Sequence, residues 1–172
     1  MQHQPTKDTN TIEHIWTRID YSWLFAGALS GASAGLLVIL VAAFGTAKIM
    51  GDWTQPFKLV GAAVFGAEAT AYGPLGKAGQ LGLFIHMTLS IIYGTVFAHL
   101  VHEKSRPASL IVLGFVTGFI IWVFSCKLFL PSFDITLATR FPSTLSLLLQ
   151  VLFGVSNSIF LVLFRPYLLK GK

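Results

Sequence analysis

The sequence predicts an all-α integral membrane protein with four transmembrane helices, and three observations carry this prediction. Of its 172 residues, 54% are hydrophobic and only 11% are charged, whereas about 25% of residues are charged in a soluble domain. The mean hydropathy is +0.72. Four long runs contain no Asp, Glu, Lys or Arg, and a helix of about 20 apolar residues crosses a bilayer. Because backbone groups in lipid must pair within their own segment, helices are expected for these runs.

The N-terminal segment, residues 1–22, is mostly polar. Its second half places Ile12, Ile15 and Ile19 at helical spacing, with charged residues between them. This pattern predicts a short amphipathic helix on the membrane surface, and an irregular polar lead-in is the alternative. The apolar run that follows is too long for the core of a secretory signal, so we expect it to remain as an anchor.

The membrane domain covers residues 23–164. Its predicted spans are residues 23–44, 81–101, 108–126 and 144–164. The apolar segment 56–72 contains Lys58 and Glu68, and as a helix it reaches about 24 Å, short of the roughly 30 Å hydrocarbon core. We therefore expect an interfacial or re-entrant helix between the first two spans. The alternative is a fifth crossing, which would place Glu68 inside the membrane.

The basic residues lie at segment ends and in loops, as expected for anchors at lipid headgroups rather than a nucleic-acid surface. With four spans, seven Lys and Arg fall on the side of the termini and five on the other side. This bias predicts cytoplasmic termini, including the basic tail 165–172. The single cysteine, Cys126, excludes an internal disulfide and a cysteine-based zinc site.

The spans carry small and polar residues on one helix face each. The second span has Gly82, His86, Ser90 and Gly94, and the fourth has Ser146, Gln150, Gly154 and Ser158 at the same spacing. This pattern indicates two copies of a hairpin, related by an axis along the membrane normal, with chance similarity as the alternative. Glycines four residues apart let helix backbones approach closely. The predicted helix-packing residues are Gly27, Gly31, Gly35, Gly94, Gly114, Gly118 and Gly154.

His86 and Gln150 lie at matching depths, each roughly 8–9 Å from the start of its span. One hypothesis is a polar path for a substrate, lined by these two residues. Its further members would be Ser90, Asn157 and, at the outer mouth, Glu68. We favour the alternative, in which His86 packs against a carbonyl or hydroxyl of a neighbouring helix, because no intramembrane acid is available for a proton relay.

Other chemistry is weakly indicated. Haem or quinone binding at His86 is an alternative, although the other spans contain no histidine to serve as a second axial ligand. His99 and His102 could hold a metal, but residues at headgroup level are the commoner explanation. Residues 31–35 match Gly-x-Ser-x-Gly and in this pentapeptide are similar to the rhomboid proteases. The strand-turn-helix context of a nucleophile elbow is absent, and rhomboids have at least six spans, so a protease is disfavoured.

Over its spans the chain resembles a group of small, uncharacterised four-span bacterial inner-membrane proteins. The resemblance is carried by His86, Ser90 and Gly94 in a His-x3-Ser-x3-Gly second span, and by a small-residue fourth span. Gln150 stands where a second histidine is expected in that pattern. The resemblance implies architecture and location and brings no activity.

These observations favour a protein without enzymatic activity or cofactor, an accessory or scaffolding subunit of a larger inner-membrane complex. Its expected partners are the lipid bilayer and other membrane subunits or further copies of itself, with no nucleic acid. One alternative is a small oligomeric transporter or channel with a path at His86, Gln150 and Asn157. Another is a haem- or quinone-binding membrane subunit.

Overall fold

The computed structural model describes residues 20–71, 73–102, 104–129 and 143–168. Of these residues 89% are helical, which confirms the all-α prediction. The elements are α2 (Tyr21–Met50), α3 (Gln55–Phe65), the 3-10 turn η1 (Ala67–Thr70), α4 (Gly76–Leu100), α5 (Pro107–Trp122), the π-helical turn η2 (Val123–Phe129) and α8 (Ser143–Leu168). In the described part of the chain, four helical segments are long and apolar enough to cross a membrane: Tyr21–Met50, Gly76–Leu100, Pro107–Leu128 and Ser143–Tyr167.

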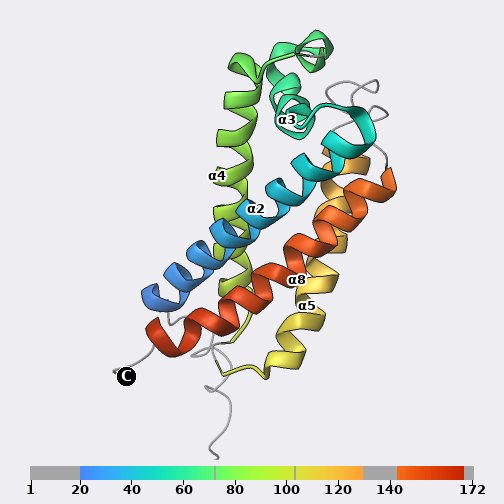
Figure 1. Ribbon diagram of the computed structural model, residues 1–172. Helices are drawn as coiled ribbons and strands as arrows, with labels where there is room; N and C mark the ends of the chain where they lie inside the picture. The colour runs from blue at the N-terminus through green and yellow to red at the C-terminus, as the bar shows by residue number, and fades with distance from the viewer. Residues whose placement is uncertain (1–19, 72, 103, 130–142, 169–172) are drawn as a thin grey trace, which may run out of the picture.

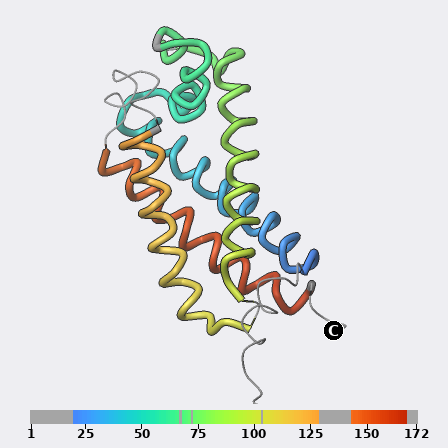
Figure 2. Tube along the Cα trace, turned by 180° about the vertical axis from the view of Figure 1, so that it is seen from behind, coloured from blue at the N-terminus to red at the C-terminus, as the bar shows by residue number. Residues whose placement is uncertain are grey.

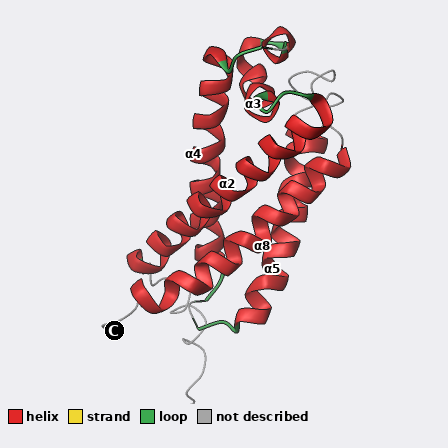
Figure 3. Ribbon diagram, viewed as in Figure 1, coloured by secondary structure: helices red, strands yellow, loops and turns green. Residues whose placement is uncertain are grey.

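The four long helices alternate in direction. In Figure 1, α2 and α5 run toward the end of the bundle where α3 lies, and α4 and α8 run away from it. We name the end that carries α3 and η1 the lobe end, and the other, where a short connection joins α4 to α5, the turn end. Figure 3 shows that the described connections are short compared with the helices. Tyr21 and Leu168, the outermost helical residues, therefore both lie at the turn end.

Helix α2 is longer than predicted, ending at Met50 rather than near residue 44. Asp20 caps its N-terminus, because Oδ1 of Asp20 accepts a hydrogen bond from the backbone N–H of Ser22 at 2.9 Å. The helix stops at Gly51, which has a φ of 71°, a left-handed conformation that suits glycine. The extra turns are tolerated because the Lys48 side chain is exposed and its Nζ lies 5.8 Å from the centre of the Phe44 ring.

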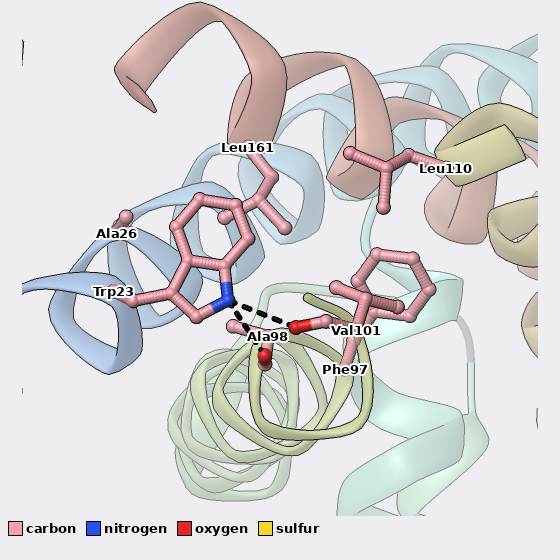
Figure 4. Close-up of a cluster of buried hydrophobic side chains, with 7 residues drawn as sticks. All are labelled: Trp23, Ala26, Phe97, Ala98, Val101, Leu110 and Leu161. Atoms are coloured by element: carbon pink, nitrogen blue, oxygen red, sulfur yellow. Dashed lines mark hydrogen bonds between the residues drawn. The ribbon is translucent and has the colours of Figure 1, made fainter. Parts of the chain in front are cut away.

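The long helices pack in the order α4, α2, α8 and α5. Figure 2 shows α4 and α5 close together at the turn end and diverging toward the lobe end. All four helices contribute to a buried cluster at the turn end, which consists of Trp23, Ala26, Phe97, Ala98, Val101, Leu110 and Leu161 (Figure 4). The indole Nε1 of Trp23 donates to the carbonyl oxygens of Ala98 at 2.8 Å and Val101 at 3.1 Å, so its one polar group is satisfied inside this cluster.

A second buried cluster lies nearer the lobe end and joins α2, α5 and α8. Its members are Ala34, Val38, Ala42, Ile121, Leu149 and Phe153. Between the predicted first and second spans, the chain forms α3 and η1 rather than one helix over 56–72. The predicted amphipathic segment lies almost wholly outside the described residues, as do the connection 130–142 and residues 169–172 of the basic tail.

Candidate functional site: glycine crossings and a buried ion pair

The predicted glycines of α2 lie at its crossing with α4. A Cβ built on Gly31 would overlap the carbonyl oxygen of Ser90 and lie 2.9 Å from the Cα of Gly94. A Cβ on Gly27 would meet the Cβ of Ala98 at 2.5 Å, and one on Gly35 would meet the side chain of Ser90. Because the neighbours of Gly31 are backbone atoms and the Cβ of Ala98 is attached directly to the backbone, larger side chains at the crossing would push the two helices apart.

The α5–α8 crossing is built in the same way. A Cβ on Gly114 would overlap the carbonyl oxygen of Gly154, and a Cβ on Gly154 would lie 2.8 Å from the backbone N of Gly118. A Cβ on Gly118 would lie 2.8 Å from the Cα of Val151. Both pairs of helices therefore depend on the absence of side chains at a few positions.

Asn157 and Ser30 join α8 to α2 inside the bundle. The Ser30 hydroxyl is 2.7 Å from Oδ1 of Asn157, and the Asn157 side chain is only 2% exposed. Ser30 also lies 2.9 Å from the carbonyl oxygen of Gly27 in its own helix. Asn157 is thus engaged in a helix-to-helix hydrogen bond at the level of the glycine crossing.

His86 is half-buried and faces α2. Its Nε2 lies 3.1 Å from the carbonyl oxygen of Gly35, and since a carbonyl only accepts, this nitrogen carries the proton. The hydroxyl of Ser90 donates to the carbonyl oxygen of His86 itself at 2.8 Å, within α4. The two residues therefore contact the α2–α4 crossing and backbone groups around it.

The remaining predicted path residues lie apart from these contacts. Gln150 is half-buried, and its backbone carbonyl lies against Gly118 of α5. Within the part of the chain that the structure describes, no hydrogen bond joins the Gln150 amide to another group. Glu68 is exposed on η1, at the lobe end. The structure therefore brings Asn157 together with Ser30 and His86 together with Gly35, and it links neither pair to Gln150 or Glu68.

The densest polar contacts surround Lys58 and Asp52 at the lobe end. The Lys58 Nζ lies 3.4 Å from Oδ2 of Asp52, and the two side chains are 3% and 5% exposed. Lys58 also donates to the carbonyl oxygens of Ala71 at 3.0 Å and Gly73 at 2.7 Å. An ammonium group has three N–H donors, so these three acceptors satisfy it fully.

Further hydrogen bonds close the same network. Oδ1 of Asp52 accepts from the backbone N–H of Thr54 at 2.8 Å and from its hydroxyl. The amide of Gln55 donates to Oδ2 of Asp52 at 3.1 Å and to the carbonyl oxygen of Thr70 at 3.0 Å. The network joins the start of α3 to the chain after η1, so residues 52–71 and 73 form a closed unit that we call the lobe.

Two opposing effects set the pKa of the Asp52 carboxyl. Burial raises this pKa, and hydrogen bonds from Thr54, Gln55 and Lys58 lower it by more, so the pKa lies below its ordinary value. Asp52 therefore carries its negative charge at neutral pH, opposite the ammonium of Lys58.

Glycines also hold the lobe against α4. A Cβ on Gly61 would overlap the carbonyl oxygen of Ala78, and a Cβ on Gly82 would overlap the carbonyl oxygen of Phe57. Gly82 belongs to the face of the second span that also carries His86 and Ser90. This face therefore contacts two different elements, α3 near its start and α2 along the rest.

At the turn end, the polar contacts lie nearer the surface. The guanidinium of Arg165 donates to the carbonyl oxygen of Ser105 at 3.1 Å and so joins the end of α8 to the α4–α5 turn. Nδ1 of His102 accepts from the backbone N–H of Lys104 at 3.0 Å. His99 and His102 are exposed. Among the described residues, no three His, Cys, Asp or Glu side chains come together as a metal-binding group.

Sequence reasoning missed the Asp52–Lys58 pair. It placed Lys58 among the headgroup anchors and did not single out Asp52. The available signal was an acid and a base six residues apart in an otherwise uncharged stretch, from Asp52 to Ala67. The carbonyls that complete the network come from residues 71 and 73, and their position depends on the turn at Gly66.

No family of known proteins, no curated protein and no solved structure matches this chain. Its function is therefore argued from the geometry of its own residues.

Proposed function

We propose that this chain is a non-enzymatic accessory or scaffolding subunit of a larger complex in the bacterial inner membrane. The observation that carries the proposal is that the polar side chains at the helix crossings contact groups of the same chain. The side chain of Asn157 is hydrogen-bonded to the hydroxyl of Ser30, and the His86 ring is hydrogen-bonded to the carbonyl oxygen of Gly35. Polar groups held in this way serve packing, which leaves the outer surface of the helices for interaction.

The outer surface of α5 supports the same proposal. This helix packs mainly on α8. Its exposed large residues are Ile111, Val112, Leu113, Phe115, Val116, Phe119 and Ile120. A surface of this kind suits lipid or the apolar helix of another subunit.

The test is native mass spectrometry of the complex released gently from its own membranes. We expect a stoichiometric second protein, and we expect it to be lost when Val112 and Val116 on α5 are both replaced by Trp. The matched control is Leu83→Trp on α4, which is also exposed. Recovery of the chain only as an isolated monomer or homo-oligomer, from several mild detergents, would contradict the proposal.

The orientation that we propose places both termini in the cytoplasm. Burial of Lys58 supports it, because this lysine does not act as an exposed anchor. Subtracting it from the five basic residues at the lobe side leaves four, against seven on the side of the termini. A fluorescent protein fused after Lys172 should fluoresce in cells, and alkaline phosphatase at the same place should be inactive. The opposite pair of results would contradict this orientation.

A small transporter or channel is a second candidate, and the amide of Gln150 favours it. The amide is half-buried in a membrane span, and it has no hydrogen-bond partner among the described residues. A polar group in that position suits a path that carries water or a polar substrate. Flux through proteoliposomes should then fall in both His86→Ala and Gln150→Ala proteins. Unchanged flux in both would remove this candidate.

A further inference from the structure

Helix α3 lies across α4 rather than along it. Figure 1 views α3 nearly along its axis, whereas α4 is seen from the side. Its contacts with Ala78 and Gly82 place it beside the first turns of α4. Since the predicted second span begins at residue 81, these contacts place α3 beside the predicted start of that span.

The outer surface of α3 carries no charge. Lys58 is the only charged residue of the helix, and its side chain is 3% exposed. The most exposed large side chains are Val64 at 64% and Phe65 at 52%, and Trp53, just before the helix, is 56% exposed. Ile49 at 66% and Met50 at 43%, at the end of α2 and shortly before Trp53 in the chain, are exposed and apolar as well.

A lysine at this depth is costly unless its charge is compensated. Here Asp52 and the carbonyls of Ala71 and Gly73 provide an acceptor for each of its three N–H groups. We propose that α3 is an interfacial helix whose outer face is covered by lipid acyl chains, and that the Asp52–Lys58 pair holds it there by removing charge from its surface. The occupant of this apolar face is the bilayer, because exposed apolar side chains follow the chain from the end of α2, a candidate membrane span, to Trp53 at the start of α3. The proposal does not depend on the accessory role.

The first test compares two single-cysteine proteins in a Cys126→Ser background. Val64→Cys reports the apolar face, and Glu68→Cys is the matched control on the exposed part of the same lobe. In open membrane fragments, a membrane-impermeant maleimide should label the Val64→Cys protein at least about tenfold more slowly, because lipid excludes the reagent. Equal labelling rates would overturn the proposal.

The second test removes the compensation. Asp52→Asn in the Val64→Cys protein leaves the Lys58 charge without its counter-ion, so the lobe should leave the lipid and labelling should approach the rate of the Glu68→Cys control. The double variant Asp52→Asn with Lys58→Met removes both charges, and it should restore slow labelling. If the double variant labels as fast as Asp52→Asn alone while far-UV circular dichroism remains native, the role assigned to the pair is wrong.

A third measurement leaves the network intact. The native protein and a Trp53→Phe variant are reconstituted in vesicles of phosphatidylcholine brominated on the acyl chains. The difference between the two proteins isolates the fluorescence of Trp53, which should be strongly quenched. Absence of quenching at Trp53 would place this side chain in water and would overturn the proposal even if the cysteine variants failed to fold.

Discussion

Replacement of Gly31 by alanine should separate α2 from α4. The added Cβ would lie 2.9 Å from the Cα and 3.1 Å from the N of Gly94, whereas carbon atoms in good contact are roughly 3.5–4.0 Å apart. The helices would have to move apart by about 1 Å. Where neighbouring atoms separate by that distance, each pair loses about a quarter to a half of its dispersion energy. Overpacking of this kind costs about 1–3 kcal/mol.

Gly45 provides a matched control in the same helix. A Cβ at Gly45 would meet nothing within 4 Å, so Gly45→Ala should only gain helix propensity, about 0.5–1 kcal/mol. Because both substitutions gain the same helix propensity, the free energies of unfolding of the two variants should differ by the overpacking term, about 1–3 kcal/mol. The assay is reversible unfolding in mixed micelles of a mild detergent and dodecyl sulfate, followed by tryptophan fluorescence. A Gly31→Ala protein as stable as the Gly45→Ala protein would refute the close-approach reasoning.

Three further predictions concern polar contacts. Trp23→Phe retains the aromatic ring but removes the N–H donor, so it should lower the free energy of unfolding by about 1 kcal/mol in the same assay. Ser30→Ala should cost about 0.6 kcal/mol, and a double-mutant cycle with Asn157→Ala should give a coupling of that size, zero coupling being the contrary result. Because the folded pKa of Asp52 is lowered, its stabilisation is complete above its unfolded pKa, about 3.9, and is lost as the pH falls through the folded value. Protection of the lobe in hydrogen exchange should thus be flat from pH 7 to about pH 5 and decline below about pH 4, and Asp52→Asn should remove this dependence.

The four long helices could be predicted because each contains a charge-free run of spanning length, and lipid leaves few alternatives for such a run. Their ends could not. Helix α4 begins at Gly76, before the predicted residue 81, because Lys77 and Gln80 are exposed and remain helical without entering the hydrocarbon. Charge marks where a span ends in the membrane, while hydrogen bonding decides where the helix itself ends.

The internal duplication stays a prediction. In the proposed alignment, Gly94 of the second span corresponds to Ser158 of the fourth, and Ser90 corresponds to Gly154. In the structure Gly31 of α2 lies against Ser90 and Gly94, whereas Gly118, which corresponds to Gly31, lies against Gln150 and Val151. The closest contacts of the two hairpins therefore differ by about one helical turn. Sequence spacing identifies the face that packs, but the register along that face depends on how each pair of helices crosses.

The glycine crossings also restrict how another subunit can bind. From the sequence, the same small-residue faces could have served contacts within the chain or contacts with a partner. The structure uses Gly27, Gly31, Gly114, Gly118 and Gly154 in contacts between its own helices. A partner must therefore meet large side chains, as on α5, or the lobe. Contacts of that kind rely on shape complementarity over a broad surface rather than on close backbone approach, so single small substitutions on α5 should weaken a complex only gradually, whereas one alanine at Gly31 should disturb the fold itself.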